Sequence, residues 1–343
     1  MYKYILILII LVSFYSLSLS STTLSLKYGF QYDNNVFNLS DSDINRFEDG
    51  FAYNYVESSD DLVNDIQIGI SNTYRFDQLR LSPFIKTTYS TKFNNNDKNS
   101  LSFLIGSYNK WNNLRFNISY GYYPQNYLRK YTDTDGTSDY EKFEYKKNLY
   151  RFTTSYRFNN LIYPHFYLKY EQYHHNKYFT EYDAPALTSG FGWKFITKYL
   201  NIDLFYYYRT YNVESDNDNI QYLIENEKDA SYESNIYEIK LKSKKYYSIL
   251  ADYRIYSGFK LENRYFQSDK PLILDPYHST RTDVISTINI GSDLWVAKNL
   301  NFNLDFKYRF RNVSSDYENV IKSKEYEKFQ ISTSIEWSFD MFN

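Results

Sequence analysis

The segment KNLNFNLDFKYRF, residues 298 to 310, alternates strictly between large apolar side chains and polar ones. Successive side chains of an extended strand point to opposite faces of a sheet. One face would therefore carry Leu300, Phe302, Leu304, Phe306, Tyr308 and Phe310. The other face would carry Asn301, Asn303, Asp305, Lys307 and Arg309. This pattern predicts a strand that lies between an apolar medium and water.

The same alternation recurs along the whole chain from Leu24 and predicts about fourteen strands, within a range of about twelve to sixteen. Each has an apolar set of the kind seen at 298 to 310. The predicted strands cover residues 24–32, 66–70, 79–89, 101–111, 114–122, 150–158, 166–170, 187–195, 200–208, 237–241, 247–255, 284–294, 300–310 and 329–339.

The links between these segments alternate in length. The short links lie within the segments FDQLRL, WNNLRF, FNNLIY, TKYLNI, SKKYYS and AKNLNF, which begin at residues 76, 111, 158, 197, 243 and 297. Long polar links cover 33–63, 123–142, 173–186, 212–232, 267–281 and 312–325, and only the link at 94–98 is short on that side. Tight turns at one edge and long loops at the other predict antiparallel neighbours in an up-and-down sheet.

Because each predicted strand has one apolar and one polar face, the sheet is expected to close on itself. In hydrocarbon every backbone N–H and C=O must be paired, and a sheet achieves this only by joining its edges. Aromatic side chains also cluster at both ends of the predicted strands, as at the two interfaces of a membrane. The pattern thus predicts an all-β fold, a single transmembrane antiparallel up-and-down β-barrel with short periplasmic turns and long extracellular loops. A secreted β-sandwich, propeller or β-helix is the soluble alternative.

The N-terminus differs from the rest of the chain. Its apolar run YILILIILVSFY, residues 4 to 15, is preceded by Lys3 and followed by small residues. Such a run is shorter than the roughly 20 residues of a spanning helix and is typical of a secretory signal. We expect residues 1–20 to be a cleaved signal peptide and residues 21–343 to form the barrel. An N-terminal anchor helix is the alternative.

Composition narrows the function classes. The chain has 343 residues, with 42 Tyr, 26 Phe and a net charge of −2, so no basic surplus indicates nucleic acid. The mean hydropathy of −0.63 argues against a helical membrane protein but not against a barrel, whose strands give only half their residues to lipid. The chain has no Cys, which excludes disulfides and thiolate metal sites.

The closing segment FQISTSIEWSFDMFN, residues 329 to 343, together with the alternating strands and the signal-like start, resembles the bacterial outer-membrane β-barrel (porin-like) class. The segment YGFQYDNNVFNL, residues 28 to 39, is similar to the opening of several porin-like barrels. Barrels of this class usually end on an aromatic residue, whereas this chain ends Phe342-Asn343. The resemblance implies the outer membrane of a Gram-negative-type bacterium, with lipid, lipopolysaccharide and the barrel-insertion machinery as partners.

If the apolar set faces lipid, the charged set faces the lumen, where basic residues outnumber acidic ones by about two to one. We predict that inward cations set a preference for anions or acidic oligosaccharides. Alternatively, opposite charges on neighbouring strands pair and fill the interior. The predicted selectivity residues are Lys86, Arg115, Arg151, Lys194, Arg209, Arg254, Lys307 and Arg309.

Candidate chemistry is sparse. The four His residues, His165, His174, His175 and His278, have no nucleophile or paired carboxylates at a catalytic spacing. The acidic fragments DTDGTSDYE at 133–141 and ESDNDN at 214–219 lack the full ligand spacing of a calcium loop. We therefore predict no catalytic residue, no cofactor and no metal site.

The predicted function is that of a porin or channel for passive diffusion of small hydrophilic solutes, anions among them. The long loop 33–63 would gate access. The sequence leaves open a plugged barrel that serves as a surface adhesin, receptor or structural protein. A barrel hydrolase is the third alternative, and it would require one of His165, His174 or His175 to meet a Ser or Asp in space.

Overall fold

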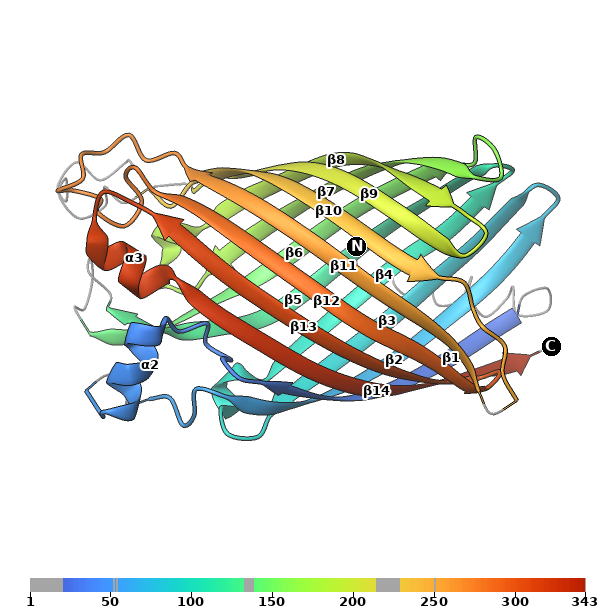
Figure 1. Ribbon diagram of the computed structural model, residues 1–343, viewed down its shortest axis with the longest axis horizontal. Coiled ribbons are helices and arrows are strands. Elements are labelled where there is room, and N and C mark those ends of the chain that lie inside the picture. The colour runs from blue at the N-terminus through green and yellow to red at the C-terminus, as the bar shows by residue number, and fades with distance from the viewer. Residues whose placement is uncertain are drawn as a thin grey trace, which may run out of the picture.

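The computed structural model shows a closed antiparallel barrel of fourteen strands (Figure 1). It describes residues 21–51, 53, 55–132, 139–213, 229–249 and 251–342. Each strand pairs with its neighbours in the sequence, and β1 pairs with β14 to close the ring. The predicted up-and-down barrel is confirmed, including its number of strands. No helix within the described ranges is long and apolar enough to cross a membrane.

The strands are longer than the alternation alone indicated. Their bounds are β1 Ser21–Asp33, β2 Asp61–Phe76, β3 Leu79–Lys92, β4 Ser100–Trp111, β5 Leu114–Thr132, β6 Tyr140–Tyr156, β7 Ile162–His175, β8 Ala184–Ile196, β9 Leu200–Tyr211, β10 Tyr232–Ser243, β11 Asp252–Phe266, β12 Thr282–Ala297, β13 Leu300–Ser314 and β14 Tyr326–Phe342. The helical segments are α2 Asp41–Glu48, α3 Glu318–Lys324 and the short 3-10 turns η2 Asn96–Lys98 and η3 Thr180–Tyr182.

The two ends of the barrel differ as the link lengths predicted. At the turn end, two-residue links at 77–78, 112–113 and 298–299 join neighbouring strands. Asp77 and Asn112 have φ of 41° and 50°, the left-handed conformation that tight hairpin turns require. At the opposite, loop end lie the longer links, and Figure 1 shows α2 and α3 together there, far from the C-terminus.

The outer wall is apolar. Alternate residues of β2 and β13 are exposed, such as Ile68 at 49% and Leu304 at 53%, although both are large hydrophobics. Their neighbours Gln67 and Asp305 are polar and turn to the other face, where Asp305 accepts a hydrogen bond from the Tyr256 hydroxyl at 3.0 Å. A water-soluble protein would not expose such a continuous apolar band, which is suited to a lipid environment.

Two predicted boundaries were wrong. The segment 123–142 was predicted to be a long loop, but β5 continues to Thr132 and β6 begins at Tyr140. The extension was hidden because two register shifts, between Tyr123 and Asn126 and between Tyr127 and Arg129, break the strict alternation. The strand predicted at 247–255 lies instead at Asp252–Phe266, because the link before it is longer than a tight turn.

Several predictions fall outside the described residues. These are the signal peptide at 1–20, all of the fragment at 214–219 and most of the fragment at 133–141. The signal peptide stays a prediction.

The outward position of Leu304 predicts a large difference between adjacent substitutions. We expect Leu304→Arg to lower the free energy of unfolding by about 2 to 4 kcal/mol, because the guanidinium would face lipid. Urea titration of the barrel refolded in lipid vesicles measures this loss. Asp305→Asn is the control, because an inward amide can still accept from Tyr256. Equal losses at 304 and 305 would contradict the assignment of the two faces.

Candidate functional site

Three cavities lie against the inner faces of the strands. The large cavity, of about 870 Å³, is lined mainly by strands β2 to β7. The basic cavity, of about 530 Å³, is lined by β6 to β11 and by Arg309 of β13. The acidic cavity, of about 410 Å³, is lined by β1 and by β11 to β14. The lumen therefore holds space of the size at which proteins bind small solutes.

The cavities differ in charge. The large cavity is lined by four basic residues, Arg80, Lys86, Lys110 and Arg115, against Glu336. The acidic cavity has Lys27 against Asp293, Asp305 and Glu336. The basic cavity has two acidic residues, Glu238 and Glu262, against seven basic ones, Arg151, Lys169, Arg209, Lys240, Lys260, Arg264 and Arg309. Positive charge is concentrated on one wall of the lumen and negative charge on another.

Three of the eight predicted selectivity residues meet in the basic cavity. Arg151 comes from β6, Arg209 from β9 and Arg309 from β13. Lys86 and Arg115 lie together in the large cavity, where Arg115 is 5.9 Å from the Tyr163 ring centroid and Lys86 is 5.7 Å from that of Phe84.

The other three predicted residues are placed differently. Lys194 pairs with Asp203 at 3.7 Å between the paired strands β8 and β9. Arg254 forms a salt bridge with Asp293 across β11 and β12. Lys307 lies between Asp305 and Arg309 on the inward-facing positions of β13. Pairing with a carboxylate, the alternative to a free basic lumen, therefore accounts for three of the eight, because Arg209 also lies 2.9 Å from Glu171 of β7.

The basic cavity also contains residues that sequence reasoning missed. Lys260, Glu262 and Arg264 line it from the second half of β11. They lie between the predicted strand 247–255 and the predicted link 267–281, so the sequence analysis assigned them to neither, because it placed the strand too early. The sequence did contain a signal for this part of the strand. Lys260, Glu262 and Arg264 alternate with Phe259, Leu261 and Asn263, which would lie on the other face.

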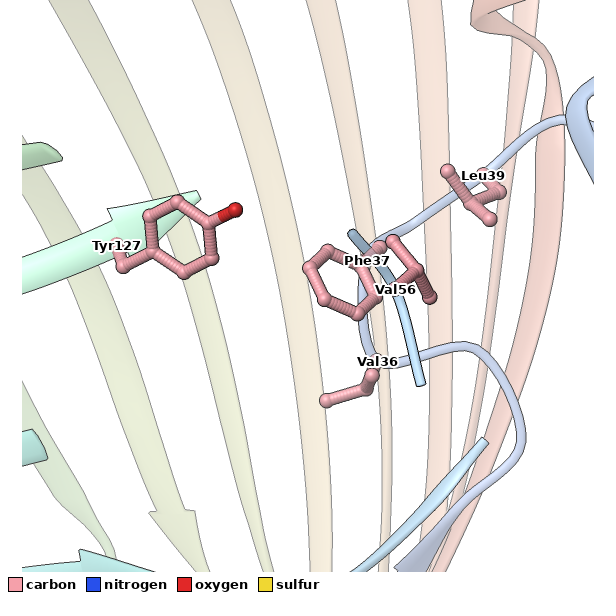
Figure 2. Packing of buried hydrophobic residues seen from close by; sticks show 5 residues of the cluster. All are labelled: Val36, Phe37, Leu39, Val56 and Tyr127. Carbon is pink, nitrogen blue, oxygen red and sulfur yellow. The ribbon is translucent and has the colours of Figure 1, made fainter. Parts of the chain in front are cut away.

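The link between β1 and β2, residues 34–60, lies at the loop end, and we call it the cap. A buried hydrophobic cluster holds it against the barrel wall (Figure 2). Val36, Phe37, Leu39 and Val56 belong to the cap, whereas Tyr127 reaches toward them from β5. The rings of Phe37 and Tyr127 meet edge to face, with centroids 6.4 Å apart. The register shifts of β5 flank Tyr127, which the sequence analysis had assigned to a loop.

Polar contacts anchor the cap at several points. Asp61, at the start of β2, is buried and accepts hydrogen bonds from the backbone N–H groups of Phe93, Asn94 and Asn95. In turn the Asn95 side chain accepts from the N–H of Glu57 at 3.2 Å. An ion pair of 3.6 Å joins Asp43 of α2 to Arg129 of β5.

Lys98, in the link between β3 and β4, contacts the cap from the side. Its Nζ lies 4.4 Å from the centroid of the Phe37 ring. Burial, and then the nearby cations Lys328, Lys92 and Arg129, lower the pKa of Lys98 from its ordinary value of 10.5 to about 7, with Asp33 acting weakly in the opposite direction. The packed cap therefore disfavours the charged form of Lys98.

The histidines are distributed between the lumen and the loop end. His165 lines the large cavity, with its ring 5.7 Å from that of Phe205. His175 lies 3.2 Å from Asp183 and packs against Phe143, and His278 lies 2.8 Å from Asp275. A His and Asp do meet, but no Ser hydroxyl hydrogen-bonds to His175 or Asp183 within the described ranges. No cluster of three or more His, Asp or Glu that could hold a metal is found in that part of the chain.

Comparisons with known proteins find no related sequence and only distantly similar structures. No protein-family model and no curated protein sequence matches the chain. Solved structures similar to it include the outer membrane channel DcaP of Acinetobacter baumannii, at 10% identity and a TM-score of 0.47 over 94% of this chain and 98% of that one. An anion-selective porin from Comamonas acidovorans aligns at 8% identity and a TM-score of 0.44, over 93% and 99% of the two chains.

A bacterial polysaccharide outer membrane secretin aligns at 9% identity and a TM-score of 0.45, over 94% of this chain and 98% of that one. Likeness at this level says nothing about solutes. The closed ring of strands and its apolar outer wall carry the assignment. The chain has the fold of a closed, fourteen-stranded, antiparallel β-barrel with an apolar outer wall.

The depressed pKa of Lys98 predicts a cap that tightens as the pH rises. Below pH 7 Lys98 is charged in both the packed and the released cap, so the full free-energy cost of burying its charge opposes packing. Between pH 7 and 10.5 it is neutral in the packed cap only, and the penalty is progressively relieved. We expect a spin label at Ser42→Cys, the only thiol in the chain, to lose mobility between pH 7 and 9.5.

Lys98→Met is the control for this titration, because it fills similar space without a titratable group. We expect it to abolish the change in label mobility. The upper limit of pH 9.5 avoids ionisation of Tyr55, whose pKa burial raises to about 12. A label whose mobility increases with pH, or an unchanged titration in Lys98→Met, would contradict the role of Lys98.

Proposed function

We propose that this protein is an outer-membrane channel for passive diffusion of small hydrophilic solutes, with a preference for anions. The observation that carries the proposal is the basic cavity, in which seven inward cations are opposed by two carboxylates. Charges that line a pore set its ion selectivity, because low-dielectric walls concentrate the field of those charges inside it.

The mechanism needs no chemical step. A solute would enter from one mouth, exchange part of its hydration shell for polar side chains of the lumen, and leave at the other mouth. Lys86 and Arg115 act on it in the large cavity, whereas Arg151, Arg209 and Arg309 act on it in the basic cavity. In this proposal Lys194, Arg254 and Lys307 contribute mainly through the local field, since the first two are paired with carboxylates.

The orientation and export of the chain belong to the same proposal. The turn end faces the periplasm and the loop end faces outward, where the long links meet lipopolysaccharide. Residues 1–20 direct export as a signal peptide, and the barrel-insertion machinery places the chain in the outer membrane. The apolar outer wall supports the membrane location.

The cap supplies a gate for this channel. Its hydrophobic cluster and its ion pair to β5 hold it at the loop end. The same packing favours a second candidate function, a plugged barrel that acts as a surface receptor, adhesin or structural protein. Conduction distinguishes the two, because only a channel carries a steady ionic current.

Single-channel recording in a planar bilayer tests the channel. Under a KCl gradient we expect a steady current whose reversal potential has the sign of chloride preference. The double variant Lys86→Glu with Arg115→Glu should move that potential toward potassium, because the large cavity would change from a cationic to an anionic excess. Silence over many insertions would favour the plugged barrel, and an unmoved reversal potential would remove Lys86 and Arg115 from the selectivity mechanism.

The gate is tested by releasing the cap. Phe37→Ala removes a buried ring that packs against Tyr127, a loss of about 3 kcal/mol or more for a well-packed site. We expect the fraction of time in the open, high-conductance state to rise. Phe51→Ala is the matched control, because this ring of the same link is 79% exposed. Equal open fractions in the two variants would mean that the cap does not gate the pore.

A further inference from the structure

The seven cations of the basic cavity divide into paired and unpaired groups. Lys169 and Arg209 both contact Glu171, at 2.8 Å and 2.9 Å. Arg264 pairs with Glu262 at 2.6 Å, and Lys260 lies 3.6 Å from the same carboxylate. Lys240 pairs with Glu238 at 3.0 Å. Three carboxylates therefore serve five of the seven cations.

Arg151 and Arg309 are the remaining two. Within the described part of the chain, neither has a carboxylate within 4.0 Å. In both residues the Nε atom is buried and has no hydrogen-bond partner among the described residues, and the same holds for Nε of Arg209. A buried donor without a partner is costly, so the surroundings of these side chains in the structure leave part of their hydrogen-bonding capacity unused.

These two guanidiniums approach the cavity from opposite walls. Arg151 belongs to β6 and Arg309 to β13, which lie seven places apart in a ring of fourteen strands. Both line the same space of about 530 Å³, so they reach it from different parts of the ring rather than from one wall.

We propose that the basic cavity is a saturable binding site for small hydrophilic solutes that carry several anionic oxygens, of the phosphate or carboxylate class, held between Arg151 and Arg309. Guanidinium groups present paired N–H donors that match the geometry of carboxylate and phosphate oxygens. This inference deepens the proposed channel function and rests on it for the route by which the solute arrives.

Charge and size both favour a multivalent solute over a single chloride ion. The lining has an excess of five cations, and adding Glu171 with its further partner Lys147 leaves this excess unchanged. One monovalent ion would neutralise little of it. The cavity is also far larger than the roughly 30 Å³ that one water molecule occupies in the liquid, so it accommodates a polyatomic solute.

The acidic cavity sharpens this preference. Asp293, Asp305 and Glu336 repel a multivalent anion from the β12 to β14 wall. This repulsion disfavours the acidic cavity and leaves the basic cavity as the place where the solute binds. The interaction is stronger in the lumen than at the surface, because salt screens inward groups less.

Isothermal titration calorimetry of the purified barrel in detergent tests the site directly, with inorganic pyrophosphate and citrate as separate probes. We expect saturable binding of at least one probe, weakened about tenfold or more in the double variant Arg151→Gln with Arg309→Gln. The matched control is Arg80→Gln with Lys110→Gln, which removes the same charge from inward positions of the large cavity and should alter affinity by less than about twofold. Pyrophosphate binding without citrate binding identifies phosphate as the source of the oxygens, and the reverse identifies carboxylate.

Channel recording with the same proteins separates failure of the site from failure of the channel. Block of a KCl current by the bound probe, lost in the arginine double variant, supports both. A conducting barrel with no saturable binding, or with equal losses in the two double variants, overturns the site and leaves the channel. A silent barrel that binds the probe through the two arginines overturns the channel and keeps the site. Equal heat-dependent gel migration of all variants confirms that each is folded.

Discussion

Backbone hydrogen bonding in hydrocarbon is the constraint on which the structure depends. A sheet in lipid cannot leave an edge, because each unpaired N–H or C=O there costs several kcal/mol. The pairing of β1 with β14 removes the last edge. Closure then divides every strand into an outward set that must be apolar and an inward set that is free to be polar. The same requirement therefore accounts for both the apolar outer wall and the charged lumen.

Within that lumen, pairing and function compete for the same side chains. Cross-strand carboxylates satisfy Lys194 and Arg254, which stabilises the barrel but reduces the field that a passing solute meets. An unbalanced field remains where cations exceed carboxylates, which occurs in the large cavity and, with a larger excess, around Arg151 and Arg309. The site is therefore defined less by which residues are basic than by which basic residues lack a carboxylate.

The sequence was sufficient for the architecture and for part of the site. Period-two alternation and alternating link lengths predicted the antiparallel barrel, because an apolar medium around the strands enforces the first and the up-and-down order of the strands accounts for the second. These two patterns placed Arg151, Arg209 and Arg309 at inward positions. No sequence pattern shows that residues about 60 and 160 positions apart line one cavity, since this depends on the curvature of the whole ring. Lys260 and Arg264 were missed because the strand was assigned too early, and Tyr127 because register shifts interrupt its strand.

The cap is attached to both sides of the seam where the first and last strands meet. Asn35 donates from its side chain to the carbonyl of Glu327 at 3.2 Å, and Lys328 of β14 donates to the side-chain oxygen of Asn38 at 3.2 Å. These contacts exist only after β14 has joined β1, roughly three hundred residues later in synthesis. The cap consequently completes its contacts to β14 only on a closed barrel, so the last strand to be synthesised helps to fix a segment that follows the first.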